Sequence, residues 1–167
     1  MIKIIGVKGN IYDIDSFLEK IQAISSKHKI IIQAFNADVI YGKNHLISAT
    51  QHAIRAMDRK TNTTNSLNME ILLYASGERQ LKLAIPKMGV KKGKGDVAFV
   101  FISDNISSKL IKDFIEDLDL KQDDKVLQGD INTLKKFGIN KDEIKTVTKD
   151  KYEDLILEKV AMVDIIK

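Results

Sequence analysis

The chain has 167 residues and a mass of 18.8 kDa; 44% of the residues are hydrophobic and 30% charged, which is typical of an ordered domain with one buried core. It contains no cysteine, which excludes disulfides, thiol nucleophiles and cysteine-bound zinc. The net charge of +4 is compatible with a polyanionic partner, and no segment has the pattern of a secretory signal or a membrane span. We therefore expect a cytoplasmic protein that does not associate with membranes.

The first part of the chain predicts a strand, a helix and a second strand. Residues 2–8 alternate as a strand does, and apolar residues then recur at helical spacing from Phe17 to about Lys27. Residues 30–35 form a short apolar run that begins with three isoleucines, which is typical of a buried strand.

A longer helix is predicted from Asn44 to about Lys60, and it has two different faces. One face is apolar and contains several small residues. The other face carries a polar line, in which residues three, four or seven positions apart stack on one another. Its members are His45, Ser48, His52, Arg55 and Arg59.

The middle of the chain predicts two more helices and a strand. Residues 67–75 are helical in pattern, and Gly77 suits the left-handed residue that ends such a helix. Glu78 would sit favourably at the positive end of the next helix, which contains Pro86 and must kink or end there. Residues 97–102 are apolar at every position, as in a central strand that helices cover on both faces.

The last third predicts helices around residues 110–118, 131–137 and 155–163, and Asp150 with Glu153 has the form of a capping box for the final one. No repeat or linker divides the chain, so we predict one domain over residues 1–167. The expected fold class is α/β of the mixed α+β kind, with helices on both sides of a small central mixed sheet.

The segment Gly89–Gly95 has the composition of a phosphate-binding loop but the wrong order. A P-loop follows a strand and ends in Gly-Lys-Ser or Gly-Lys-Thr, whereas this segment precedes a strand and ends in Lys94-Gly95. We interpret it as a basic surface turn, and we predict no cofactor.

The histidines do not form a recognisable catalytic or metal-binding group. His45 and His52 lie two helical turns apart, about 10.5 Å, which is too far to share one metal ion. An acid/base enzyme would need an orienting group and a substrate site beside one of them, and the sequence supplies neither. We predict no metal site and no catalytic residue, and we keep a small enzyme that uses His45 or His52 as an alternative.

Arg55, Arg59 and Arg79 are candidates for contact with nucleic acid. The flat guanidinium fork matches phosphate oxygens and stacks on bases, and Arg79 is expected at a helix N-terminus, where free backbone N–H groups attract anions. Ordinary surface salt bridges, for example between Arg55 and Asp58, explain the same arginines equally well.

The middle of the chain also carries a distinctive series of motifs. They are Asn36–Gly42 (NADVIYG), His45-Leu46, Ala49, Ala53, Arg55-Ala56, Glu70–Leu81 (EILLYASGERQL), Ala84-Ile85 and Gly89-Val90. Through these motifs, residues 31–102 resemble the small regulatory, kinase-binding subunit of the KEOPS complex, the TPRKB family. The likeness returns weakly at residues 156–161 and is most specific at Ser76–Gln80.

The resemblance implies a non-catalytic subunit that binds the N-terminal lobe of the atypical kinase/ATPase of the complex. It also implies that the chain holds the single-stranded CCA tail of tRNA, so that a separate catalytic subunit can install threonylcarbamoyl on the adenosine next to the anticodon. By matching position, we expect the RNA to face Arg79, Gln80 and the backbone of Ser76 and Gly77, and then Asn36, His45, Arg55 and Arg59. A protein-only adaptor, which regulates the kinase without binding RNA, is the main alternative.

Overall fold

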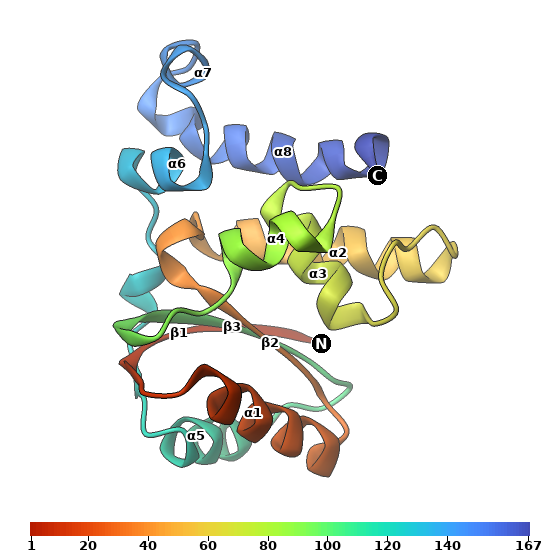
Figure 1. Cartoon of the computed structure of the whole chain (residues 1–167), viewed down its shortest axis with the longest axis vertical. Coiled ribbons are helices and arrows are strands. Elements are labelled where there is room, and N and C mark those ends of the chain that lie inside the picture. The colour runs from red at the N-terminus through yellow and green to blue at the C-terminus, as the bar shows by residue number, and fades with distance from the viewer.

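A computed structural model describes all residues from 1 to 167 and contains one four-stranded sheet with helices on both faces (Figure 1). The strands, in their spatial order, are β2 (Ile31–Asn36), β3 (Gly93–Ile102), β1 (Ile2–Ile11) and β4 (Lys121–Gln122). The predicted mixed α/β class is confirmed. The predicted mixed sheet is wrong, because every neighbouring pair of strands is antiparallel.

Strand β3 explains this difference. β1, the helix α1 (Ile14–His28) and β2 follow one another as predicted, and the two strands run parallel to each other. They do not pair, because β3 lies between them and pairs antiparallel with both. The apolar run of residues 97–102 favours this central position, since its side chains are covered on both faces of the sheet.

Helices α1 and α5 (Ser108–Asp117) cover one face of the sheet (Figure 1). Phe114 of α5 packs edge-on against two phenylalanines of β3, with its ring centroid 4.9 Å from Phe99 and 5.0 Å from Phe101. This aromatic cluster forms the centre of the core on that face, because such edge-to-face pairs combine large buried area with favourable ring geometry.

The other face of the sheet carries the larger core. Its helices are α2 (Gly42–Asp58), α3 (Leu67–Ser76), α4 (Leu81–Met88), α6 (Ile131–Phe137), α7 (Lys141–Lys145) and α8 (Tyr152–Ile166), with short 3-10 turns η1 (Ala37–Val39), η2 (Asp124–Leu127) and η3 (Lys149–Lys151). Helix α3 contacts β2, α2, α4 and α8, and every residue from Glu70 to Ser76 is buried. Figure 1 shows α8 lying across the outer side of this layer. None of the helices has both the length and the apolar character needed to cross a membrane.

Glu70 brings a carboxylate into this core, where its side chain is fully enclosed. It accepts hydrogen bonds from the backbone N–H of Thr63 and Thr64 and from the Thr64 hydroxyl, and its Oε1 lies 3.2 Å from Nζ of Lys167. Burial by itself would raise the pKa of Glu70, but these hydrogen bonds hold it below its ordinary value. The end of α8 is thereby tied to the loop before α3.

Two details of the predicted helices differ from the structure. The capping box at Asp150 and Glu153 is wrong: α8 begins at Tyr152 after a 3-10 turn, and Asp150 accepts a bond from the Thr148 hydroxyl instead. Pro86 does not end α4, which continues to Met88 and stops before Gly89 as predicted.

Candidate nucleic-acid interface

The junction between α3 and α4 contains the motif that the sequence singles out. Gly77 ends α3 with φ of 70°, as predicted, and its N–H bonds to the carbonyl of Tyr74. The Ser76 hydroxyl donates to the carbonyl of Leu73 and accepts from the N–H of Glu78. Ser76 and Gly77 therefore close a helix and do not open one, so the Gly77 N–H is used within α3, and contact of this backbone with RNA stays a prediction.

Arg79 and Gln80 do lie at the start of a helix and are exposed. Gln80 directly precedes α4, and the N–H groups of Leu81 and Lys82 have no helical acceptor at the positive end of the helix dipole, whereas the Leu83 N–H bonds to the Gln80 carbonyl. The ion pairs of the protein involve lysines and one histidine only, so Arg79 has no acidic partner within 4.0 Å. This part of the predicted site is open and positively charged.

A shallow cleft of about 220 Å³ adjoins the junction. It is lined by Gly77, Glu78, Lys87, Phe137, Gly138, Ile139 and Lys159. Lys87 donates to the carbonyl of Ser76 at 2.7 Å, lies 3.3 Å from a carboxylate oxygen of Glu78, and sits 3.8 Å above the Phe137 ring. Burial lowers the pKa of Lys87, which Glu78 partly offsets. Two lysines and one carboxylate leave the cleft with a modest positive charge.

Sequence reasoning did not propose Lys87, Phe137 or Lys159 as site residues. These residues come from α8, α6 and α4, so no spacing along the chain could bring them together. Gly77 gives the one retrospective signal: a β-carbon there would lie 3.2 Å from Cβ of Lys159 and 3.5 Å from the Phe137 ring. Glycine is thus required by both its conformation and the close approach of α8.

His45 does not belong to an exposed RNA surface. Its side chain is fully buried, its Nδ1 accepts from the N–H of Tyr41 at 3.1 Å, and its Nε2 lies 2.8 Å from the carbonyl of Ala75. This arrangement requires the neutral ring with the proton on Nε2. The prediction of His45 as an RNA contact is wrong in this conformation, because α3 covers the apolar side of α2 and the ring links the two helices.

Arg55 and Arg59 lie at the opposite end of α2 from the junction. Both are exposed, and Arg59 is about 21 Å along the helix axis from His45. Neither arginine forms an ion pair, so the expected salt bridge between Arg55 and Asp58 is absent. The polar line of the sequence thus breaks into a buried histidine and a separate, free basic end.

Asn36 has a structural role at the end of β2. Its side-chain oxygen accepts from the N–H of Asp38 at 3.1 Å and caps the short turn η1. Asn36 pairs with Val97 of β3 and caps η1, and neither of these interactions involves the junction between α3 and α4.

His52 links three helices. Its Nδ1 lies 3.0 Å from a carboxylate oxygen of Asp164, its ring stacks on Tyr74, and the Tyr74 hydroxyl donates to the other oxygen of Asp164. Burial raises the pKa of Tyr74, and the bond to Asp164 raises it further. α2, α3 and α8 are held together by these contacts. No three His, Asp or Glu side chains are placed to hold a metal ion.

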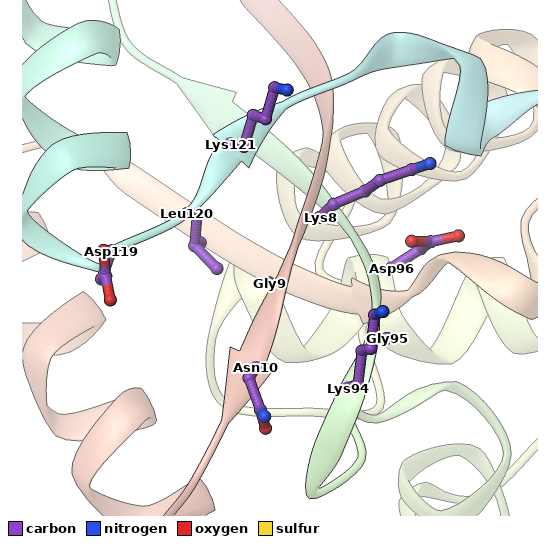
Figure 2. A pocket seen from close by; sticks show the side chains of 9 residues that line it. All are labelled: Lys8, Gly9, Asn10, Lys94, Gly95, Asp96, Asp119, Leu120 and Lys121. Carbon is purple, nitrogen blue, oxygen red and sulfur yellow. The ribbon is translucent and has the colours of Figure 1, made fainter.

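The basic turn of residues 89–95 opens onto a second hollow, of about 570 Å³ (Figure 2). Figure 2 shows that Lys8, Lys94 and Lys121 reach it from β1, β3 and β4. Asp96 and Asp119 line the same hollow, so it contains charges of both signs and is not a concentrated cationic patch. We assign no phosphate site to it.

Comparison with known proteins decides the family. A family model described as "Kinase binding protein CGI-121" matches residues 10–164. The chain belongs to this family. It is 37% identical over 90 residues to the KEOPS complex subunit Cgi121 of Pyrococcus abyssi, a match that covers 53% of this chain and 52% of that protein. It is 31% identical over 140 residues to the regulatory protein Cgi121 of Methanocaldococcus jannaschii, with 81% and 84% covered.

The CGI-121 match spans both the junction and the far end of α2, and the resemblance inferred from the motifs is confirmed. The chain covers about half the length of the Pyrococcus protein and most of the Methanocaldococcus protein.

The buried His45 makes the stability of this CGI-121 protein depend on pH. Desolvation lowers the pKa of His45 from 6.5 to about 4, so the unfolded chain binds a proton that the folded protein excludes in this range. Stability therefore falls as the pH drops, by about 2 kcal/mol between pH 7 and pH 5. Urea unfolding at both pH values, with His45→Gln and with the exposed His28→Gln as control, measures this contribution. The first variant should lose most of the dependence and the second should keep it.

Proposed function

We propose that this protein is a non-catalytic subunit of a KEOPS complex, in which it docks on the kinase and holds the CCA tail of tRNA during threonylcarbamoyladenosine formation. Membership of the kinase-binding CGI-121 family supports the kinase role, and the relatives carry the names of a complex subunit and a regulatory protein. The observation that carries the RNA role is the free, exposed Arg79 at the start of α4, beside a cleft that contains two lysines.

The junction has the chemistry that a flexible ribonucleotide end needs. Arg79 and the first-turn N–H groups of α4 would bind phosphate, and the Gln80 amide would read the edge of an unstacked base. Lys159 lies at the edge of the same cleft on the side of α8, where the carboxylate of Glu143 pairs with it at 3.1 Å. In this proposal the cleft takes the single-stranded terminus and not the duplex.

Arg55 and Arg59 would contact another part of the tRNA. Along the axis of α2, Arg55 lies about 15 Å and Arg59 about 21 Å from His45 at the junction end, and both guanidinium groups are free of ion pairs. Contacts to the phosphates of the acceptor stem would add affinity without reading sequence. The two basic regions thus divide between tail recognition and general attraction.

The end of α8 is the surface we propose for the kinase. Met162, Ile165 and Ile166 are all large, apolar and exposed, and the Ile165 side chain is 75% accessible. The other exposed large apolar residues of the chain are spread over several elements, whereas these three lie within two turns of one helix. Such clusters on a soluble protein commonly mark a protein interface.

Removal of the CCA tail from tRNA should weaken binding far more than a change in the tRNA body. The tail is the single-stranded part that fits the junction, and the body would contribute mainly salt-sensitive attraction. Gel shifts with intact tRNA, trimmed tRNA and an intact tRNA of different sequence measure the difference. Equal affinity for intact and trimmed tRNA would leave the adaptor function, without RNA binding at the tail, as the better account.

Arg79→Ala should lower the affinity for intact tRNA and reduce the slope of log affinity against log salt by somewhat under one unit per lost phosphate contact. Its effect should vanish on trimmed tRNA, because the contact partner is missing there. Arg59→Ala, at the other basic region, should weaken binding of intact and trimmed tRNA alike. An Arg79→Ala effect of the same size on both tRNAs would remove Arg79 from the tail site.

Ile165→Asp should weaken binding to the kinase subunit at least about tenfold, since a carboxylate would be buried in an apolar contact. Isothermal titration with the kinase of the same complex gives the affinity. Ile131→Asp is the matched control, because Ile131 is an exposed isoleucine of α6 that lies outside the proposed surface. Equal losses in both variants would show that the end of α8 is not the docking surface. Binding of tRNA to Ile165→Asp should persist, which separates the two roles.

A further inference from the structure

The uncovered edge of the sheet carries an apolar groove that neither proposed role uses. β2 pairs only with β3, so its other side has no neighbouring strand. A groove of about 570 Å³ at this edge is lined by residues of α1, β2, α3 and α4. Figure 1 shows α1 on one face of the sheet and α3 and α4 on the other. The lining of the groove is Ile14, Leu18, Ile21, Gln22, Ile32, Gln33, Ala34, Asn68, Met69, Leu72, Ile85, Pro86, Gly89, Val90 and Lys91.

The walls of the groove are unusually apolar for a surface. Leu18 of α1 and Ile85 of α4 are 44% and 48% exposed, and they lie in opposite helical layers with β2 between them. Natural proteins generally cover or charge a sheet edge, because its free backbone groups pair readily with other chains. Here the residues that flank the edge offer apolar contact instead of charge.

One backbone carbonyl of the edge strand β2 is already bonded by a side chain of the same strand. The Gln33 side chain donates from Nε2 to the carbonyl of Ala34 at 2.9 Å, and both residues line the groove. A side-chain amide that bonds a backbone carbonyl of its neighbour occupies an acceptor that an added strand would use. The net gain in free energy from such a bond is small, so it can be exchanged for a backbone bond from a ligand.

The groove is lined by one positively charged side chain and by no negatively charged one. Lys91 is the single ionisable side chain among the lining residues, and its Nζ donates to the carbonyl of Pro86 at 2.7 Å at the exposed end. No carboxylate lines the groove, and its other polar side chains are the amides of Gln22, Gln33 and Asn68. A ligand that carries an acidic group at the Lys91 end is therefore complementary to it.

We propose that this groove binds an extended segment of a partner protein, which adds as a strand to β2, is apolar at alternate positions and has an acidic residue beside Lys91. Strand addition supplies backbone hydrogen bonds along β2, while the pockets between α1 and α4 select the alternate side chains. The unpaired backbone favours a peptide over a small apolar acid, which has no groups to match it.

Selection from a phage-displayed library of random heptapeptides on the full chain tests this. Enriched peptides should alternate apolar residues and end in an acidic one, and a synthetic copy should protect β2 amides from hydrogen exchange. Ile85→Asp should weaken its binding at least about tenfold. Leu83→Asp should change it less than about twofold, because Leu83 is equally exposed on α4 but lies outside the lining.

Two further experiments test separately the backbone hydrogen bonds and the charge of Lys91. A copy of the peptide with alternate backbone amides methylated keeps the side chains but loses the donors, and it should not bind. Lys91→Glu should reverse the preference, so that a peptide ending in lysine binds better than one ending in aspartate. The proposal is overturned if the library yields no peptide or if methylation has no effect. It is also overturned if decanoate, a small apolar acid, binds the groove and displaces the peptide while the β2 amides stay unprotected from hydrogen exchange.

Discussion

The enclosure of α3 is the constraint on which the rest of this structure depends. A helix that is buried from Glu70 to Ser76 must contact other elements on every side, and it does so through β2, α2, α4 and α8. Its polar groups can then be satisfied only inside the protein, which explains the bonds to Glu70, Ser76 and the carbonyl of Ala75. The same packing determines the position of the α3–α4 junction, because α6 and α8 lie directly against the end of α3 at Gly77.

The sequence identified most of the elements because their patterns are local. Periodic apolar residues gave α1, α2 and α3, and the fully apolar run of residues 97–102 gave the central strand. The strand directions were missed because they depend on which strand occupies the middle of the sheet. That strand, β3, is far from β1 and β2 in the sequence, so no local pattern shows that it lies between them. The short elements β4, η1 and η2 have too few residues to carry a period.

The residues of the candidate site were likewise predicted correctly only where the sequence carries a local signal. Arg79 and Gln80 were placed correctly on an exposed helix start, because Gly77 marks the end of the preceding helix. His45 was misjudged, since its position on a polar line gave no sign that α3 would cover it. A histidine with both ring nitrogens bonded is a satisfied core residue, and only the three-dimensional neighbours distinguish it from a ligand-binding one. The cleft residues of α6 and α8 had no signal in their own spacing, and only Gly77, which they approach closely, points to them in retrospect.

The split arrangement of β1 and β2 also bears on how the protein is made. Both strands precede β3 along the chain, so neither can pair with it until residues 93–102 have been synthesised. Until then the apolar faces of β1, α1 and β2 remain without the strand that joins them. Non-local pairing of this kind slows folding and prolongs the exposure of unpaired edges. The nascent chain therefore passes through a stage in which β1, α1 and β2 have been made and the sheet does not yet exist.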